Sequence, residues 1–452
     1  MKSVEAIQKL SSYNVDSGNI SCLIEAFEQI GRINKGVDIE PIKRFINHKS
    51  PEVRALAIKN LAKIISQENI RIFITAFNTD DNTIVKREAI SAIGRQRNRE
   101  NIDFLISTLS DNDPKIVCQS IRALLVFKSD LVVDEALKKL ASHENEIVKA
   151  FINKEYFLGK KKKISEKPHA NVDARLANVV VLGDVRDVLK HVDDESIHLT
   201  FTSPPYYNAR DYSIYRSYEA YLSFLKEVFE ATHRITKEGR FLIVNTSPVI
   251  VPRVSRAHSS KRYPIPFDLH AILTKMDWEF IDDIIWEKPE YSVKNRIGGF
   301  QQHRKPLAYK PNNVTEYLMV YRKRTDRLLD WNIRQYNQET VSSSKVKDGF
   351  ETTNVWKIHP KSHKVHSAIF PVELCQRVIN YYSYKGDLVF DPFAGSGTLG
   401  RTADAMGRKF FLTEQEPRYF EYMEGLSDQN NLFDDDATRF LTLDEFMGGE
   451  KI

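Results

Sequence analysis

The pattern of apolar residues divides the chain into two parts of different kind. In the first third, an apolar helix, a polar turn and a second helix form a unit that recurs. Val53, Val85 and Val117 mark the recurrence at a spacing of 32 residues, and Val148 extends it at 31. Paired helices of this period bury their faces only by stacking on one another, so the pattern predicts a helical solenoid. A non-repetitive helical bundle is the alternative. The first helices of the units are expected at 42–46, 70–77 and 102–109.

Beyond residue 178 the pattern changes to short strands that alternate with helices. Residues 196–202 alternate in polarity and are rich in strand-forming residues, and 387–391 read as a buried strand. A helix is expected over 399–406 and a further strand over 409–413. Strands that alternate with helices predict an α/β domain.

Candidate chemistry begins with the loop after the first of these strands, Thr202-Ser203-Pro204-Pro205-Tyr206. Two successive prolines stiffen this loop, because each fixes its own φ and biases the preceding residue toward an extended backbone. Loops at the carboxyl ends of strands are where open α/β sheets bind ligands. The Ser203 hydroxyl and the Pro204 carbonyl are acceptors that can hold the hydrogens of a planar exocyclic amine, and Tyr206 offers a ring face for a base. A plain turn followed by a core tyrosine is the alternative.

A second motif, Asp391-Pro392-Phe393-Ala394-Gly395-Ser396-Gly397-Thr398, follows the strand at 387–391. A strand, a glycine-rich turn and a helix form a nucleotide-binding unit, because glycines let the backbone approach the ligand and a helix N-terminus favours polar groups. The next strand leads into Glu414, where such folds hold ribose hydroxyls, and Glu416 is the alternative acid. The loop lacks the lysine of a P-loop, which argues against an ATPase.

Together the two motifs resemble the S-adenosylmethionine-dependent DNA amino-methyltransferases of the permuted β group, in which the catalytic motif precedes the cofactor motif. The resemblance extends over roughly residues 178–425 and includes weaker blocks near 181–189, 221–244, 284–321 and 366–381. It implies a Rossmann-like methyltransferase sheet with helices on both faces and S-adenosylmethionine as cofactor. The implied substrate is an exocyclic amine of a base flipped out of double-stranded DNA. Neither a metal nor a covalent intermediate is required.

The resemblance also implies roles for single residues. The catalytic loop corresponds to Ser203, Pro204, Pro205 and Tyr206. The cofactor side corresponds to Asp184, Phe370, Asp391, Pro392, Phe393, Ala394, Gly395, Ser396, Gly397, Thr398 and Glu414. Two of these matches are less specific, because Asp184 also reads as the cap of a turn and Phe370 as ordinary core.

The first residue of the catalytic tetrapeptide bears on which base is methylated. Serine rather than aspartate at position 203 resembles the cytosine-N4 branch of the family, so cytosine N4 is the expected target and adenine N6 the alternative. Cytosine C5 chemistry is disfavoured, because none of Cys22, Cys118 and Cys375 follows a proline. Methyltransferases that act on RNA or on protein amides generally carry asparagine first and place the cofactor motif first. A non-enzymatic adaptor that binds no cofactor is a further alternative, although both motifs are intact.

Length and composition fit a multi-domain protein of a reducing compartment. A chain of 452 residues is too long for one typical core, and its three scattered cysteines cannot form a disulfide framework. We find no secretory leader and no apolar run long enough to span a membrane. A cytoplasmic protein without a membrane partner is therefore expected.

Positive charge gathers between the two motifs. The chain has a net charge of +5, and residues 250–327 contain 15 Lys/Arg against 9 Asp/Glu. Phosphate contacts need cations, and base edges are read by Gln, Asn or Arg, so these loops are the expected target-recognition region. An ordinary solvated surface is the alternative. The candidate DNA-binding residues are Arg253, Arg256, Lys261, Arg262, Lys294, Arg296, Arg304 and Lys305.

The repeating helices at the start of the chain resemble short HEAT-like repeats. A solenoid of this kind could lie along DNA or recruit a protein partner such as a cognate restriction endonuclease, and the sequence leaves both open. Five regions are expected: a HEAT-like repeat domain (1–158), a basic linker that contains Lys160–Lys163 (159–177), a catalytic half (178–249), the basic target-recognition region (250–363) and a cofactor-binding half with a C-terminal tail (364–452).

Overall fold

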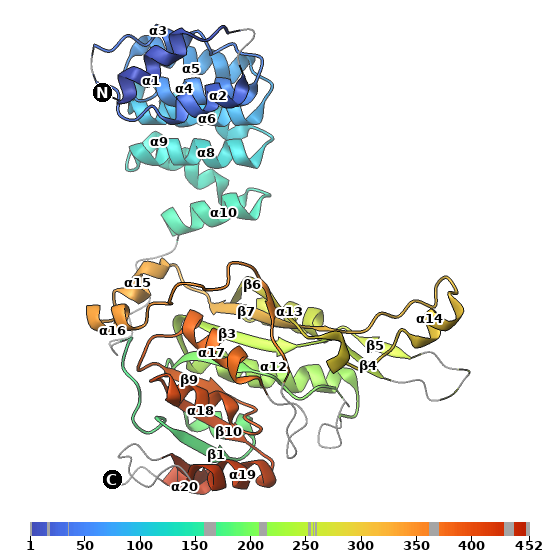
Figure 1. The fold of residues 1–452 in the computed structure, drawn as a ribbon. Coiled ribbons are helices and arrows are strands. Elements are labelled where there is room, and N and C mark those ends of the chain that lie inside the picture. Colours follow the sequence, from blue (N-terminus) through green and yellow to red (C-terminus); the bar gives the residue numbers. More distant parts are fainter. Residues whose placement is uncertain are drawn as a thin grey trace. The chain divides into compact units, whose positions relative to one another are not determined.

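The computed structural model forms two compact units, residues 1–164 and 165–452 (Figure 1). It describes residues 2–15, 19–34, 36–157, 169–207, 215–251, 255, 257, 260–360, 370–428 and 438–448. Some predicted features lie outside these residues: the tetralysine Lys160–Lys163, the candidate DNA-binding residues Arg253 and Arg256, and the expected boundaries after 158 and 363.

The N-terminal unit is entirely helical in its described part. Val53, Val85, Val117 and Val148 are fully buried at equivalent places in the second helix of each pair, so the 32-residue spacing marks one repeated core position. The helices are α1 (Lys2–Ser11), α2 (Ile20–Glu28), α3 (Glu40–Lys43), α4 (Pro51–Leu61), α5 (Gln67–Thr79), α6 (Thr83–Gln96), α7 (Ile102–Ser107), α8 (Pro114–Leu124), α9 (Leu131–Lys138) and α10 (Glu146–Ile152).

The second helices of the repeats stack directly on one another. α4 packs on α6 and α6 on α8, and their side chains form a single core with those of the first helices. The approach of α6 to α8 is very close, since a Cβ placed on Gly94 would lie 2.7 Å from the Cβ of Ala123. The paired helices therefore stack as a solenoid rather than as an irregular bundle.

Two predicted helices end earlier than expected. The helix expected at 102–109 is α7, which ends at Ser107 and is followed by a 3₁₀ turn at Thr108–Ser110, and the helix expected at 42–46 is α3. The apolar stretch 42–46 predicted a helix, but α3 ends at Lys43, and Phe45 and Ile46 donate to carbonyls three residues back. These i to i+3 bonds are a tighter turn than an α-helix makes, so the α-helix stops. Ile42 and Phe45 are still fully buried, and the apolar pattern therefore marked core positions correctly.

The C-terminal unit is built on a nine-stranded sheet in the order β11-β1-β10-β9-β2-β3-β7-β6-β8. The strands from β11 to β3 run parallel, β7 is antiparallel to both of its neighbours, and β8 is parallel to β6. They are β1 (Val179–Leu182), β2 (Ile197–Thr202), β3 (Thr236–Thr246), β6 (Trp278–Glu287), β7 (Thr315–Lys323), β8 (Val355–Lys357), β9 (Leu388–Asp391), β10 (Lys409–Glu414) and β11 (Arg439–Thr442).

Helices cover both faces of this sheet, which confirms the predicted α/β architecture. On one face Val180 and Leu199 pack with α17 (Val372–Tyr382), α18 (Thr398–Ala405) and α19 (Pro417–Asp428). On the other face Val179 and Leu242 belong to the clusters that include α11 (Val185–Val188), α12 (Tyr218–Ile235), α13 (Ile265–Lys275) and α20 (Leu443–Gly448). The alternation of side chains along each strand thus places one hydrophobic layer on each side.

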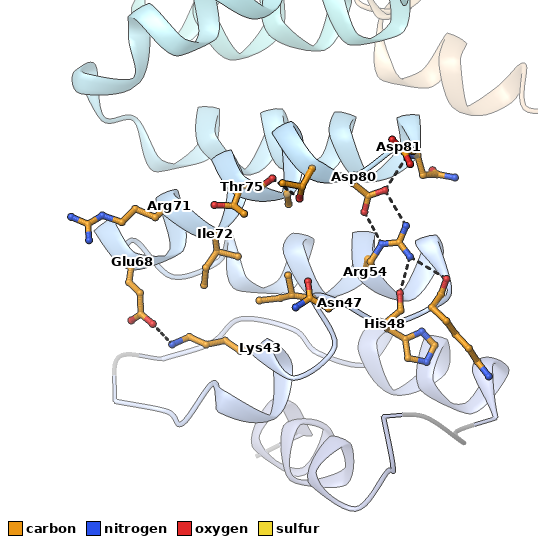
Figure 2. A pocket seen from close by; sticks show the side chains of 15 residues that line it. Lys43, Asn47, His48, Arg54, Glu68, Arg71, Ile72, Thr75, Asp80 and Asp81 are labelled. Carbon is orange, nitrogen blue, oxygen red and sulfur yellow. Dashed lines mark hydrogen bonds and ion pairs between the residues drawn. The ribbon is translucent and has the colours of Figure 1, made fainter.

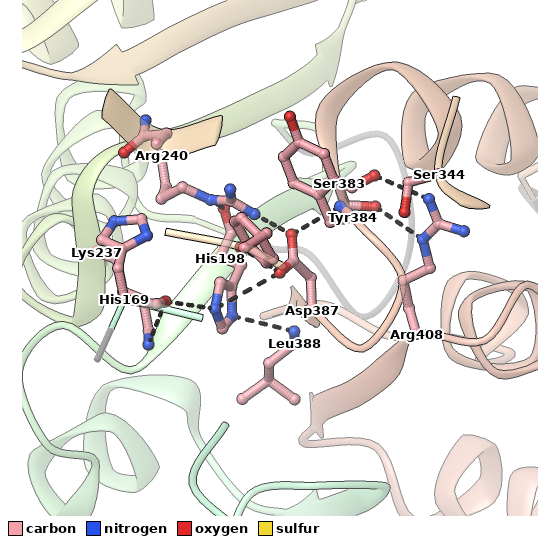
Figure 3. A network of polar contacts seen from close by, with 12 residues as sticks. His169, His198, Lys237, Arg240, Ser344, Ser383, Tyr384, Asp387, Leu388 and Arg408 are labelled. Carbon is pink, nitrogen blue, oxygen red and sulfur yellow. Dashed lines mark hydrogen bonds and ion pairs between the residues drawn. The ribbon is translucent and has the colours of Figure 1, made fainter. Parts of the chain in front are cut away.

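A buried polar network closes the amino ends of β2 and β9 (Figure 3). The Asp387 carboxylate binds the Arg240 guanidinium from β3, and both side chains are almost completely buried. The backbone N–H of Leu388 donates to Nδ1 of His198 at 3.1 Å, so the His198 Nε2–H donates to the carbonyl of His169 at 3.0 Å. This pairing requires a neutral ring, and burial holds the pKa of His198 well below its ordinary value. The network joins strands that are far apart in sequence.

Three smaller helices and one hairpin complete the described part of this unit. They are the hairpin of β4 (Val249–Val251) and β5 (Lys261–Tyr263), and α14 (Gly298–His303), α15 (Leu329–Ile333) and α16 (Gln338–Ser343). Within the described residues no helix is both long enough and apolar enough to span a lipid bilayer.

Candidate functional site

A cavity of about 440 Å³ opens at the carboxyl ends of the parallel strands. The loop after β2 and the loop after β9, which carry the two sequence motifs, both contribute to its walls. Because β2 and β9 are neighbours in the sheet, motifs almost two hundred residues apart meet at one edge. The volume lies within the usual range of about 300–1,000 Å³ for a small-molecule site.

The loop after β2 contributes all four predicted catalytic residues, Ser203, Pro204, Pro205 and Tyr206, to the cavity wall. The Tyr206 hydroxyl lies 3.2 Å from Oε2 of Glu316 and donates to it, and the Ser203 hydroxyl hydrogen-bonds to Tyr206. Burial, and then the negative charge of Glu316, raise the pKa of Tyr206 well above its ordinary value. The phenol therefore stays protonated at neutral pH and acts as a hydrogen-bond donor.

Glu316 and Lys288 belong to the cavity wall although we did not select either as a site residue from the sequence. Glu316, on β7, forms an ion pair with the Lys288 ammonium, and both side chains are largely buried. Lys288 also lies 4.6 Å from the ring centroid of Trp286. A charged residue at the end of an apolar strand was the available signal in both cases. Their pairing depends on β6 lying antiparallel to β7, which the sequence motifs do not specify.

Asp391 links the two loops. Its Oδ1 accepts hydrogen bonds from the Thr202 hydroxyl at 2.7 Å and from the backbone N–H of Phe393 at 3.0 Å. Burial raises the pKa of the Asp391 carboxyl to about 7, with the charge of Glu414 adding to the effect. One buried carboxyl therefore fixes the end of β2 against the start of the glycine-rich turn.

Two glycines of this turn adopt the left-handed backbone region that favours glycine. The φ of Gly395 is 54° and that of Gly397 is 70°. At Gly397 a Cβ would also lie 2.5 Å from Sδ of Met423, so this residue packs against α19. The other seven predicted positions of the motif line the cavity: Asp391, Pro392, Phe393, Ala394, Gly395, Ser396 and Thr398.

The Glu414 carboxylate holds the backbone of two segments together. One oxygen accepts from the Gly395 N–H at 2.7 Å, and the other from the Glu416 N–H at 2.9 Å. Burial raises the pKa of Glu414. Both acids line the cavity, but only Glu414 combines that position with backbone hydrogen bonds to the glycine-rich turn. A carboxylate with two such bonds retains lone pairs for a ligand hydroxyl.

The structure treats the two less specific matches differently. Asp184 is the N-cap of α11, where it accepts from the Arg186 backbone and pairs with the Arg186 guanidinium at 2.8 Å. Its neighbours Gly183 and Val185 line the cavity, and Asp184 is not among the lining residues. The capped-turn alternative therefore describes its observed contacts. Phe370 has both roles, since it lines the cavity and stacks on Phe201 of β2 with centroids 4.5 Å apart.

Among the residues that the structure describes, no group of three or more His, Cys, Asp and Glu could hold a metal ion. Cys22 and Cys118 are partly exposed, Cys375 is buried, and all three are free thiols. None of them is among the residues that line the cavity.

The described basic candidates lie on two segments that together we call the basic arm: Lys261, Arg262, Lys294, Arg296, Arg304 and Lys305. Arg296 is partly buried and the other five are exposed. Burial lowers the pKa of Arg296, and the charge of Arg262 is a second, smaller cause. The segment with Lys261 and Arg262 therefore lies beside the segment with Lys294 and Arg296. Lys310 donates to Ser260 at 3.0 Å and joins the same two loops. Ser292 lines the cavity only a few residues before Lys294, so one loop connects the cavity to the arm.

Known proteins resemble the region that carries this cavity. The model of a DNA methylase family that covers N6 and N4 methyltransferases matches residues 197–425, half of the chain. The Type II beta methyltransferase M.BslI of Bacillus sp. (strain NEB-606) is 28% identical over 253 residues, which are 54% of this chain and 26% of that protein. The Type II methyltransferase M.Cfr9I of Citrobacter freundii is 28% identical over 290 residues, which are 57% of this chain and 90% of that protein.

A solved structure and the helical region add two further similarities. The protein TTHA0409 of Thermus thermophilus is 26% identical, with a TM-score of 0.46 over 59% of this chain and 99% of that protein. A model of HEAT repeats matches residues 70–152, which confirms the predicted repeat type. The chain thus spans about a quarter of M.BslI and almost all of TTHA0409.

Proposed function

The chain belongs to the DNA methylase family of N6 and N4 methyltransferases, and from that premise we propose that it methylates an exocyclic amine of a base in double-stranded DNA. One observation carries the proposal: a stiff Ser-Pro-Pro-Tyr loop and a glycine-rich turn, which follow adjacent strands, line the same cavity. The first can hold a planar amine and the second a nucleoside. Methyl transfer requires both groups at one place, because the acceptor and the methyl donor must be aligned.

S-adenosylmethionine is the cofactor, and the residues of the cavity fit it. The positive φ of Gly395 lets the backbone approach a ligand closely, Glu414 and Glu416 offer carboxylates to ribose hydroxyls, and Phe370 and Phe393 offer apolar rings. When bound, this cofactor supplies a methyl group that its sulfonium has already activated. The protein therefore has to position the acceptor amine and exclude water from the cavity.

The Ser203–Tyr206 loop would position the target amine. An exocyclic amine is a poor nucleophile because its lone pair is delocalised into the ring. Acceptors around its hydrogens, the Ser203 hydroxyl and the Pro204 carbonyl, would favour a pyramidal nitrogen with an available lone pair. The base has to leave the stacked duplex to reach this loop, and Tyr206 would receive it on the face of its ring. Glu316 supports this geometry by accepting the Tyr206 proton in a hydrogen bond.

The basic arm would contact the DNA that flanks the flipped base. Its exposed cations can neutralise phosphates, and its loop begins beside the cavity. The relatives M.BslI and M.Cfr9I are Type II methyltransferases, which supports a site-specific enzyme of a restriction-modification or epigenetic system. The recognised sequence would then be read by polar side chains of the arm such as Gln301 and Gln302.

Ser203 supports cytosine N4 as the methylated atom, with adenine N6 as the alternative. The test is mass spectrometry of nucleosides from DNA that the full chain has treated with S-adenosylmethionine. We expect N4-methylcytosine, absent from DNA treated with cofactor alone. N6-methyladenine as the sole product would refute the choice of base and leave the reaction class intact, whereas an unmodified digest would count against both.

A further inference from the structure

A row of cations follows the stacked second helices of the helical unit. Lys59 lies on α4, Arg87 and Arg95 on α6, and Arg122 on α8. Lys59, Arg95 and Arg122 are exposed, and Arg87 is partly exposed. We call this set the helical ridge. Figure 1 shows the three helices one after another along the unit.

The electrostatic coupling of neighbouring groups shows that these cations lie close together. Burial is the larger cause of the lowered pKa of Lys63, and the charges of Lys59 and Arg95 lower it further. Burial raises the pKa of the Cys118 thiol, and the charges of Arg122 and Arg87 act in the opposite direction. The thiol therefore lies near both arginines. The ridge is thus continuous from α4 to α8. Neighbouring like charges repel one another, and a bound polyanion would relieve this repulsion.

The protein neutralises the helical ridge only in part. One carboxylate, Glu88, lies among its cations: it pairs with Arg95 at 3.3 Å. Burial raises the pKa of Glu88, and the charges of Arg95, Lys59 and Arg87 act in the opposite direction. In the described part of the chain, Lys59, Arg87 and Arg122 form no ion pair with a carboxylate. The Nε of Arg87 is buried and has no hydrogen-bond partner.

A groove on the same unit provides the contrast. It has a volume of about 820 Å³, and Figure 2 shows two ion pairs among its charged side chains. Arg54 binds Asp80 at 2.6 Å, and Lys43 binds Glu68 at 2.7 Å. Arg54 and Lys43 therefore form ion pairs with carboxylates, whereas no ion pair of Lys59, Arg87 or Arg122 is found among the described residues.

We propose that the helical ridge is a second DNA-binding surface, which binds the phosphate backbone independently of sequence. Stacked helices lie about 8–10 Å apart and present cations at that repeat, and a duplex carries about one negative charge per 1.7 Å of its axis. An array of this kind matches a regular polyanion better than the few irregular carboxylates of a protein surface. The proposal rests on DNA being the substrate of the C-terminal unit.

The test compares two triple variants of the full chain. The ridge variant K59Q/R87Q/R122Q leaves the Glu88–Arg95 pair intact. The control K9Q/R71Q/K139Q removes the same charge from exposed positions on other helices. Binding of a fluorescent random-sequence duplex is measured by anisotropy between about 50 and 200 mM salt. Circular dichroism establishes that both variants are folded.

We expect the salt dependence, the slope of log K against log salt, to fall by about 2–3 in the ridge variant, since each lost phosphate contact removes about 0.9. Affinity at the lowest salt should fall at least tenfold, and the control should resemble the parent. A ridge variant with the slope and affinity of its control would overturn the proposal. Lost binding to polyglutamate with unchanged DNA binding would overturn it as well, in favour of an acidic protein partner.

The outcome is separable from the proposed function. Labelled-methyl transfer by the parent chain is measured on the same duplex. Transfer with an unaltered salt slope in the ridge variant rejects the ridge alone. A reduced slope without any transfer by the parent rejects the methyltransferase and leaves a DNA-binding ridge. A parent chain that does not bind the duplex rejects both.

Discussion

Three largely buried carboxyl groups hold the wall of the cavity together. Glu316, Asp391 and Glu414 each hold one segment of the wall against another, by accepting hydrogen bonds from Tyr206, Thr202 and the Gly395 backbone respectively. A carboxyl in such a place is sensitive to its charge, because burial penalises the ionised form. Changes that alter charge but keep shape are therefore the most informative substitutions here.

Asp391→Asn should alter how stability depends on pH. The folded pKa of about 7 lies above the ordinary value of 3.8, so the folded state binds this proton more tightly than the unfolded chain. The resulting stabilisation is full below about pH 4 and is lost as the pH rises to about 7. Asparagine does not titrate and keeps the acceptor for Thr202 and Phe393.

We therefore expect the cofactor-free variant to be more stable than the parent at pH 8, by on the order of 1–3 kcal/mol. The difference should shrink or reverse at pH 4. Urea unfolding of both proteins across this range measures it. A variant less stable than the parent at every pH would show that the carboxylate itself is needed.

Glu316→Gln should slow catalysis without weakening cofactor binding. The substitution removes the charge that holds both Tyr206 and Lys288, and a charge-assisted hydrogen bond contributes about 1.5–3 kcal/mol. We expect kcat to fall roughly 10- to 100-fold, while the Kd for S-adenosylmethionine changes less than about twofold. Glu287→Gln, at the neighbouring end of β6, is the matched control and should retain activity. Equal losses in both variants would argue against a specific role for Glu316.

At the scale of elements, two helices of the N-terminal unit approach very closely at Gly94. Ala123 leaves no room for a Cβ there, although alanine is the better helix former by up to about 1 kcal/mol. Overpacking of a core costs about 1–3 kcal/mol, so Gly94→Ala should lower the free energy of unfolding of the helical unit. Urea unfolding followed by circular dichroism measures the change.

The double variant G94A/A123G separates contact from propensity. Removing the Ala123 methyl group removes the 2.7 Å contact with a Cβ at position 94. The double variant should therefore lose less free energy of unfolding than the sum of the losses in the two single variants. A single variant that is more stable than the parent would mean that the two helices separate freely at this point.

Elements with strong local patterns were predictable from the sequence. The glycine-rich turn predicted a helix at 399–406 and a strand at 409–413, and the structure has α18 at Thr398–Ala405 and β10 at Lys409–Glu414. The short α3 was not predicted correctly, because the apolar pattern marks buried positions whether the turn is tight or regular. The role of Asp184 was also not predictable from the motif alone. Its carboxylate caps a helix and pairs with Arg186, two residues later, instead of lining the cavity.

At the scale of the whole molecule, the sequence predicted the order of the parts but not the contacts between distant segments. The alignment of valines at 32 residues was enough to predict the solenoid. The Lys288–Glu316 pair and the buried network of His198, Arg240 and Asp387 depend on strand order in the sheet, which no local pattern specifies. The helical ridge likewise requires the stacking of three helices.

On the proposed function, the two motifs form one active site, and the chain transfers a methyl group to DNA through this cavity. Transfer of labelled methyl from S-adenosylmethionine to duplex DNA, RNA and protein, by the full chain and by a folded Tyr206→Ala variant, tests this account. It predicts label in DNA alone, reduced at least about a hundredfold in the variant. Label in RNA or protein instead of DNA, or undiminished transfer by Tyr206→Ala, would contradict it.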